Sequence, residues 1–229
     1  MKRLGSPRLH LRRTRSTNDR AQELARAGAP HGTLVTAAEQ TAGRGRQGRT
    51  WSAPPGRALL FSLVLREPPR LLPLAAAVAV AEEVGAEARI KWPNDVLLDA
   101  RKVAGILTEG RPQEGWAVLG VGLNVALAPE DLPFELRERA GTLRRRPDEL
   151  EPTLGRLLDG LERWLAAPAA AVLDAYRARD ALLGREIAWS GGEGTAAGID
   201  GEGRLVVTGA GQGRTTLEAG EVHLSAAAR

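Results

Sequence analysis

Residues 43–51 read GRGRQGRTW, in which Arg44, Arg46 and Arg49 alternate with glycines and Trp51 closes the run. Glycine disfavours regular structure by roughly 1 kcal/mol per residue, so this stretch, here named the Gly/Arg loop, is predicted to be a mobile loop. Backbone N–H groups of such a loop can bind phosphate, and arginine binds it through paired hydrogen bonds. RNA-binding segments and solvated surface loops share this composition. The loop therefore predicts an anionic ligand without identifying it.

A second group of cations lies in KWPNDVLLDARK (91–102), which holds Lys91 and Lys102, two of only three lysines in an arginine-rich chain. Lysine carries a compact charge where arginine carries a planar fork, so these positions indicate a need for the smaller group. Pro93 directs Trp92 away from the helical conformation, which predicts a turn. Two ammonium groups near one turn can stabilise charge that develops on a phosphate. A plain hairpin with exposed lysines fits the same spacing.

Two polar segments could complete a site. GVGLNV (120–125) sets glycines in an apolar strand, which indicates close approach of a ligand or of another backbone, or simply a bulge. Its Asn124 could hydrogen-bond a base or a phosphate, although the segment is not a dinucleotide fingerprint, because no helix follows and the third glycine is missing. STN (16–18) begins a helical pattern and is most simply a cap, yet a helix N-terminus also binds polar ligand groups.

The elements that must position these residues follow from apolar periodicity. Strands are expected over 8–13, 33–40, 58–65, 89–92, 102–109 and 116–127, with 95–109 forming a hairpin, and helices over 16–28, 71–86, 148–166 and 169–183. From Gly184 onward, short strands separated by glycines predict a small β-barrel. The fold class expected is α+β, with a mixed β-sheet domain over 1–183 and a small β domain over 184–229.

Composition excludes several classes of function. The chain has no cysteine, so disulfides, thiolate metal sites and thiol nucleophiles are excluded. Its three histidines are far apart, and no metal site is predicted. The apolar run at 71–86 is too short and too interrupted to span a bilayer, and the first residues lack a signal-peptide core, so a soluble cytoplasmic protein with no membrane partner is expected. A net charge of +4 permits nucleic-acid binding without requiring it.

In their order and spelling, these segments together resemble biotin protein ligases: STN, then Gln40 and GRGRQGRTW, then KWPNDVLL with KVAGIL, then GVGLN, then a small β domain. The resemblance covers nearly the whole chain, from Ser16 to Leu224, and the Gly/Arg loop together with KWPND is its most specific part. It implies a mixed sheet with helices on one side and an SH3-like C-terminal β-barrel. Regulatory members carry a DNA-binding domain before STN, for which this chain has few residues, so no DNA partner is expected.

The resemblance also implies a role for each site residue. Those implied to bind biotin are Ser16, Thr17, Asn18, Gln40, Arg44, Gly45, Arg46 and Lys91; those implied to bind ATP or the adenylate are Arg46, Arg49, Trp51, Lys102 and Asn124. Lys91 and Arg46 are the implied catalytic residues, because they match positions at the reacting carboxyl and phosphate. The polar groups of STN and Gln40 suit the ureido ring of biotin, and the Gly/Arg loop is expected to close over the adenylate.

The function implied is the activation of biotin with ATP and Mg²⁺ to biotinyl-5′-AMP, followed by transfer to a lysine of a biotin carboxyl carrier protein of acetyl-CoA carboxylase. The family includes homodimers, and the apolar strands would permit one. Two alternatives remain. A lipoate or octanoate ligase or transferase shares the architecture, although the absence of cysteine excludes an acyl-thioenzyme route. A nucleic-acid-binding module requires stacking aromatics, which make up only 3% of the chain.

Overall fold

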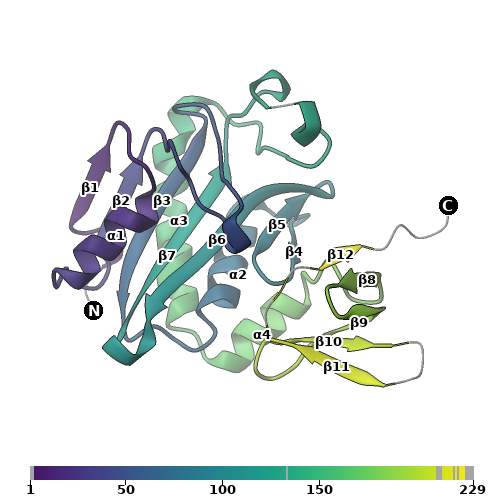
Figure 1. Cartoon of the computed structure of the whole chain (residues 1–229). Helices are drawn as coiled ribbons and strands as arrows, with labels where there is room; N and C mark the ends of the chain where they lie inside the picture. The colour runs from purple at the N-terminus through teal and green to yellow at the C-terminus, as the bar shows by residue number, and fades with distance from the viewer. Residues whose placement is uncertain (1–2, 133, 210–212, 219, 221, 225–229) are drawn as a thin grey trace.

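The computed structural model describes residues 3–132, 134–209, 213–218, 220 and 222–224. Its larger sheet has seven strands in the order β1-β2-β3-β7-β6-β5-β4 (Figure 1). These strands are β1 (Arg8–Leu11), β2 (Leu34–Ala37), β3 (Ala58–Arg66), β4 (Arg89–Lys91), β5 (Asp95–Leu98), β6 (Arg101–Arg111) and β7 (Trp116–Asn124). The β1–β2 pair is parallel and the other pairs are antiparallel, so the sheet is mixed, as predicted.

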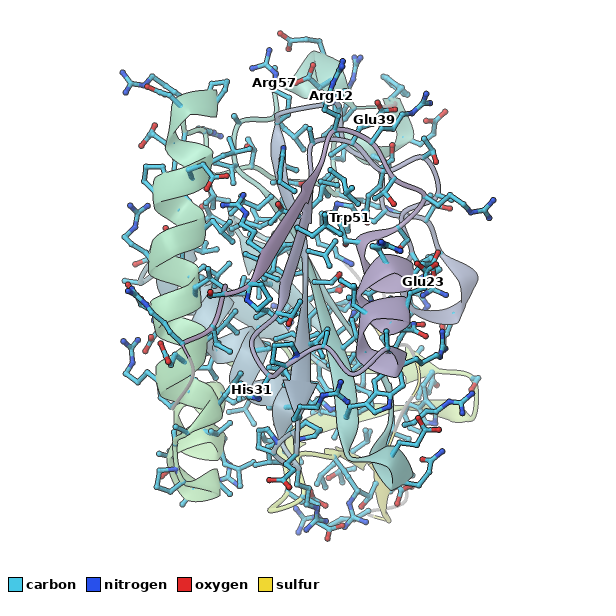
Figure 2. The ribbon with its side chains drawn as sticks, turned by 90° about the vertical axis from the view of Figure 1, so that its left-hand side faces the viewer. Arg12, Glu23, His31, Glu39, Trp51 and Arg57 are labelled. Atoms are coloured by element: carbon cyan, nitrogen blue, oxygen red, sulfur yellow. The ribbon has the colours of Figure 1, made fainter. Side chains whose placement is uncertain are left out.

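Helices cover both faces of this sheet. They are α1 (Thr17–Arg26), α2 (Leu72–Val84), α3 (Leu150–Leu165) and α4 (Ala169–Arg177). The last three lie on one face, where Leu63 and Leu65 of β3 belong to the main apolar core. On the opposite face, Ala21 of α1 packs with Val64 and Val118 in a second cluster. Figure 2 shows the sheet edge-on, with α1 in purple and α3 in green on opposite sides.

The one-sided arrangement implied by the resemblance therefore holds for α2, α3 and α4, whereas α1 departs from it. The reason lies in the strands: successive residues point to opposite faces, and both Leu63 and Val64 are apolar, so both faces of β3 need a cover. None of the helices in the described part of the chain has the length and apolar character that a crossing of a lipid bilayer requires.

The short helix α1 packs mainly on β2, β3 and β7, and only its first turn reaches β6, through Asn18. Beyond it, the same face presents glycines: Gly105 of β6 is the register partner of Gly122 of β7, and Gly120 lies two residues earlier on β7. Glycines lower the surface of the sheet here because they project no side chain. The uncovered part of this face thus has room for a ligand and for the side chains that surround it.

The hairpin predicted over 95–109 is confirmed as β5 and β6. Its two-residue turn, Asp99–Ala100, has positive φ angles of 51° and 59°, as a type I′ turn requires. This turn folds β6 back along β5, so that Lys102 pairs with Leu97 in the ladder. Consequently Lys102 returns to the neighbourhood of Asp95 and Lys91.

A second, antiparallel sheet follows, with the strand order β11-β10-β9-β8-β12, and it is consistent with an SH3-like domain. Its strands are β8 (Glu186–Trp189), β9 (Gly192–Ile199), β10 (Leu205–Thr208), β11 (Arg214–Leu217) and β12 (His223–Leu224). The indole Nε1 of Trp92 donates to the carbonyl of Gly203 at 3.1 Å. Arg177 of α4 also donates to the carbonyl of Ile199, at 3.3 Å. The second sheet therefore packs against the turn that follows β4.

Candidate active site

A pocket lies on the α1 face of the large sheet, between the start of α1, the Gly/Arg loop and the turn after β4. Its empty space, with the open mouth included, is about 930 Å³. The residues implied by sequence that line it are Ser16, Thr17, Asn18, Gln40, Arg44, Gly45, Arg46, Arg49, Trp51, Lys91 and Lys102. Gly220 and Val222, which precede β12, also line it. The fold thus brings four separate sequence motifs to one pocket.

The Gly/Arg loop is folded as a narrow hairpin. Arg44 and Thr50 form an antiparallel bridge, the backbone N–H of Gly45 donates to the carbonyl of Arg49 at 2.7 Å, and the N–H of Trp51 donates to that of Gly43 at 2.9 Å. A Cβ at Gly43 would collide with the Trp51 carbonyl, so close backbone approach, and not mobility alone, requires this glycine. The loop is therefore an ordered wall of the pocket.

Trp51 closes the loop onto the sheet; its place in the molecule is labelled in Figure 2. Its ring lies so close to Gly122 that a Cβ there would overlap the indole, and a Cβ at Gly105 would lie 3.0 Å from it. The ammonium of Lys102 is 5.6 Å from the ring centroid, within cation–π range. Among the described residues, none is a hydrogen-bond partner of the buried indole Nε1. The packing of Trp51 on the strand thus explains Gly122, whereas a Cβ at Gly120 would collide with the side chain of Asn18.

Three cations and one carboxylate form what we call the cationic end of the pocket: Arg46, Lys91, Lys102 and Asp95. The Lys102 ammonium lies 2.6 Å from the Asp95 carboxylate, and Arg46 donates to the side chain of Asn94 at 3.4 Å. Burial lowers the pKa of Lys91 below its usual value, and Asp95 raises it part of the way back. Burial likewise lowers the pKa of Arg46. This end has the charge and partial desolvation needed to bind an anion strongly.

The opposite end of the pocket is polar and uncharged. Ser16, Thr17 and Asn18 are buried at the start of α1. Ser16 occupies the N-cap position, but its side chain makes no capping bond. Instead Gln40 Oε1 accepts from the backbone N–H of Thr17 at 2.7 Å and from its hydroxyl at 3.0 Å. Donors and acceptors fixed in this way can bind a neutral polar ring. The acid group of the same ligand would then lie at the cationic end.

Two of the implied residues have hydrogen-bond or ion-pair partners outside the pocket lining. The guanidinium of Arg44 pairs with the carboxylates of Glu109 and Asp19, each at 2.8 Å. Asn124 is buried and does not line the pocket; its amide donates to the carbonyl of Gly141 at 2.9 Å. In this structure, therefore, Arg44 ties the loop to the protein and Asn124 ties β7 to a neighbouring loop.

Sequence reasoning missed two carboxylates at this site. Asp95 lies with Asp99 between Lys91 and Lys102, and a carboxylate placed among these cations is a candidate counter-charge. Glu109 belongs to no recognised motif. Only the pairing of β6 with β7 brings it near Asn18 and Arg44. Its proximity to them could not be inferred from spacing along the chain.

The sequence pattern of the biotin/lipoate A/B protein ligase family matches residues 10–125. A biotin–[acetyl-CoA-carboxylase] ligase of Mycobacterium tuberculosis is 36% identical over 232 residues, covering 91% of this chain and 85% of that protein. A ligase of the same name from Paracoccus denitrificans is 36% identical over 242 residues, covering 93% and 98%. The bifunctional ligase/repressor BirA of Bacillus subtilis is 43% identical over 140 residues, which is 56% of this chain but only 43% of that longer protein.

Solved structures agree with these relatives. The biotin protein ligase of Aquifex aeolicus, in complex with biotin and ATP, superposes with a TM-score of 0.78 at 27% identity, covering 96% of this chain and 98% of that one. The likeness extends over both sheets, because nearly all of both chains is covered. Pocket, fold and sequence lead to the same assignment: the chain belongs to the biotin/lipoate A/B protein ligase family.

Proposed function

We propose that this protein is an ATP-dependent ligase that activates biotin to biotinyl-5′-AMP and transfers the biotin to a lysine of a biotin carboxyl carrier protein. The observation that carries the proposal is the two-ended pocket, in which the uncharged Thr17–Gln40 end and the cationic end around Lys91 share one cavity. Biotin has the matching form, a neutral ureido ring joined to a carboxylate. The two relatives that match along most of this chain are both named as ligases of this kind.

In the first step, an oxygen of the biotin carboxylate attacks the α-phosphorus of ATP and pyrophosphate leaves. Lys91 and Arg46 neutralise the carboxylate and phosphate charges as the two groups approach, and Lys102 adds a third positive charge. This requires no covalent nucleophile, because the protein acts by positioning and by charge. We assign the reacting centre to the cationic end, between the Gly/Arg loop and the turn after β4.

Magnesium fits this site as a companion of the nucleotide. Among the described residues, no group of three or more His, Asp and Glu residues could hold a metal ion alone. Of those that line the pocket, Asp95 alone carries a carboxylate. Mg²⁺ is commonly bound by one or two carboxylates together with substrate phosphates, so Asp95 would be its protein ligand. When bound, the ion would supply charge neutralisation to the phosphates.

In the second step, the ε-amine of the carrier lysine attacks the acyl carbon of the mixed anhydride and AMP leaves. Until the carrier arrives, the adenylate must be kept from water. Trp51 and the Gly/Arg loop form the wall that would do this, because the loop lies over the pocket and the indole is packed against Gly122.

We further propose that residues 1–183 form the catalytic domain and that 184–229 form a second domain that supports it. Gly220 and Val222 of the second part line the pocket, and Gly203 accepts the Trp92 hydrogen bond. The carrier we propose is that of acetyl-CoA carboxylase, after the names of the two long-matching relatives. We place the reaction in the cytoplasm, where ATP and such a carboxylase would be found together.

Acyl-adenylate formation tests the proposal without knowledge of the carrier. The protein is mixed with MgATP and, separately, with biotin, lipoate or octanoate, then quenched and analysed for acyl-AMP by mass spectrometry. Biotinyl-AMP alone is expected. Lipoyl- or octanoyl-AMP in its place would overturn the assignment of Thr17 and Gln40 to the biotin ring. No adduct with any acid from folded protein would overturn the proposed reaction as a whole.

A further inference from the structure

Glu109, near the end of β6, connects three parts of the site although it does not line the pocket. A single carboxylate oxygen, Oε2, accepts from Asn18 Nδ2 at 2.8 Å and from Arg44 Nη2 at 2.8 Å. Its side chain is 28% exposed, so water screens these contacts only in part. One oxygen therefore joins β6 to the polar end of the pocket and to the Gly/Arg loop.

The first consequence concerns the orientation of Asn18. An ionised carboxylate can only accept hydrogen bonds, so the Asn18 NH₂ group must face Glu109 and its oxygen must face the other way. Asn18 Oδ1 accepts from the buried hydroxyl of Ser62 at 2.5 Å and lies directly over Gly120 on the pocket floor. Glu109 at 2.8 Å, together with the carbonyl of Leu107 at 3.4 Å from the same nitrogen, thereby makes Asn18 present an acceptor, and not a donor, at the polar end of the pocket. The ring N–H groups of biotin are donors and match that acceptor.

The second consequence concerns the Gly/Arg loop. Arg44 Nη2 is held jointly by Glu109 and by Asp19 in the first turn of α1, each at 2.8 Å. Because Arg44 is paired with Thr50 across the loop hairpin, an anchor on Arg44 also places the returning half of the loop, which ends at Trp51. An exposed ion pair contributes little alone, but here two carboxylates share one guanidinium. The loop is thus attached at its base to both β6 and α1.

We propose that Glu109 is a positioning residue that fixes the Asn18 amide for biotin and anchors the Gly/Arg loop over the reacting groups. This rests on the proposed function, because it names biotin as the ligand of the polar end. Glu109 itself touches neither biotin nor ATP; it acts through Asn18 and Arg44. Asp19 holds the same guanidinium, but among the described residues the Asn18 amide donates to Leu107 and Glu109 and not to Asp19, so Asp19 provides a matched comparison.

The test compares Glu109→Gln with Asp19→Asn, after both have been shown by thermal unfolding to be folded. Calorimetry measures the biotin Kd without nucleotide, and rapid filtration measures the release of preformed biotinyl-AMP. Glu109→Gln can turn its own N–H toward Asn18 and lets that amide rotate, so its biotin Kd should rise about tenfold or more. Asp19→Asn should leave the biotin Kd within about twofold of wild type. Both variants should release the adenylate faster than wild type.

A biotin Kd for Glu109→Gln within twofold of wild type overturns the Asn18 assignment, and unchanged adenylate release overturns the anchoring of the loop. Should Glu109→Gln fail to fold, Glu109→Asp retains the charge but withdraws the carboxylate by one methylene; its biotin Kd should also rise, and a wild-type Kd overturns the proposal. A wild-type protein that forms no biotinyl-AMP would refute the proposed function itself. That outcome differs from one in which the wild-type protein binds biotin and Glu109→Gln binds it with the same Kd. The second outcome contradicts only the role of Glu109.

Discussion

Lys91 is the partly buried cation on which the proposed first step depends most. Replacing it with Met keeps the apolar stem and removes the charge that would meet the biotin carboxylate and the α-phosphate. We expect adenylate formation to fall by about a hundredfold or more, in line with the loss of a group that stabilises developing charge. Thermal unfolding should change little or improve, because the side chain of this variant carries no charge to desolvate. Arg101→Met, at an exposed neighbour of Lys102, is the control; normal adenylate yield from Lys91→Met would contradict the role.

The same residue predicts a pH dependence. Burial lowers the pKa of Lys91 from 10.5, so the ammonium is lost at a lower pH than in an ordinary lysine. The kcat/KM for adenylate formation, which reports groups of the free enzyme, should therefore decline as pH rises through that lowered pKa. Stability should respond with the opposite sign: between the lowered pKa and 10.5 the unfolded chain binds more protons, so the free energy of unfolding rises with pH. In Lys91→Arg the alkaline decline should move to higher pH, and an unmoved decline would assign it to another group.

At the scale of elements, the Gly/Arg loop can pack on β7 because Gly122 has no side chain. Gly122→Ala would place a Cβ within the indole of Trp51, so the ring must leave the strand and the neighbourhood of Lys102. We expect a loss of about 1–3 kcal/mol in urea unfolding, the usual effect of overpacking, together with faster loss of bound adenylate. Gly155→Ala, in α3 with open space around it, should instead raise stability by up to about 1 kcal/mol. Equal effects of the two substitutions would show that Trp51 does not hold the loop.

The elements were predictable wherever local pattern decides them. The apolar run at 58–65 became β3 and the alanine-rich run at 71–86 became α2, because the first has the length of a strand and the second has the length and composition of a helix. The parallel pairing of β1 with β2, and the face on which α1 packs, depend on contacts between distant segments and were not predictable. The same distinction applies to the site. The cations could be predicted from sequence motifs, whereas the pairing of Arg44 with Glu109, 65 residues further along the chain, arises only in the fold.

At the scale of the whole molecule, the second sheet meets the first at the residues that carry the proposed chemistry. Trp92, between Lys91 and Pro93, is buried and donates its indole N–H to the carbonyl of Gly203, in the turn between β9 and β10. Gly203 has a φ of 78° and no room for a Cβ, which would lie 2.8 Å from Leu74. The second sheet thus packs directly on the turn that follows Lys91, and its position should influence how firmly the cationic end is held.

Trp92→Phe tests this connection because it keeps a large ring and deletes only the donor. The carbonyl of Gly203 then loses a buried partner, which should reduce the free energy of unfolding by about 1–3 kcal/mol. Hydrogen–deuterium exchange should increase over residues 200–208 while β6 and β7 stay protected, and the KM for ATP should rise, because the turn beside Lys91 is less firmly held. Trp189→Phe, on β8 of the second sheet, is the matched control and should leave the KM for ATP unchanged. If exchange over 200–208 and the KM are both unaltered in Trp92→Phe, the two sheets pack together without affecting the chemistry, and the catalytic role must be confined to the first.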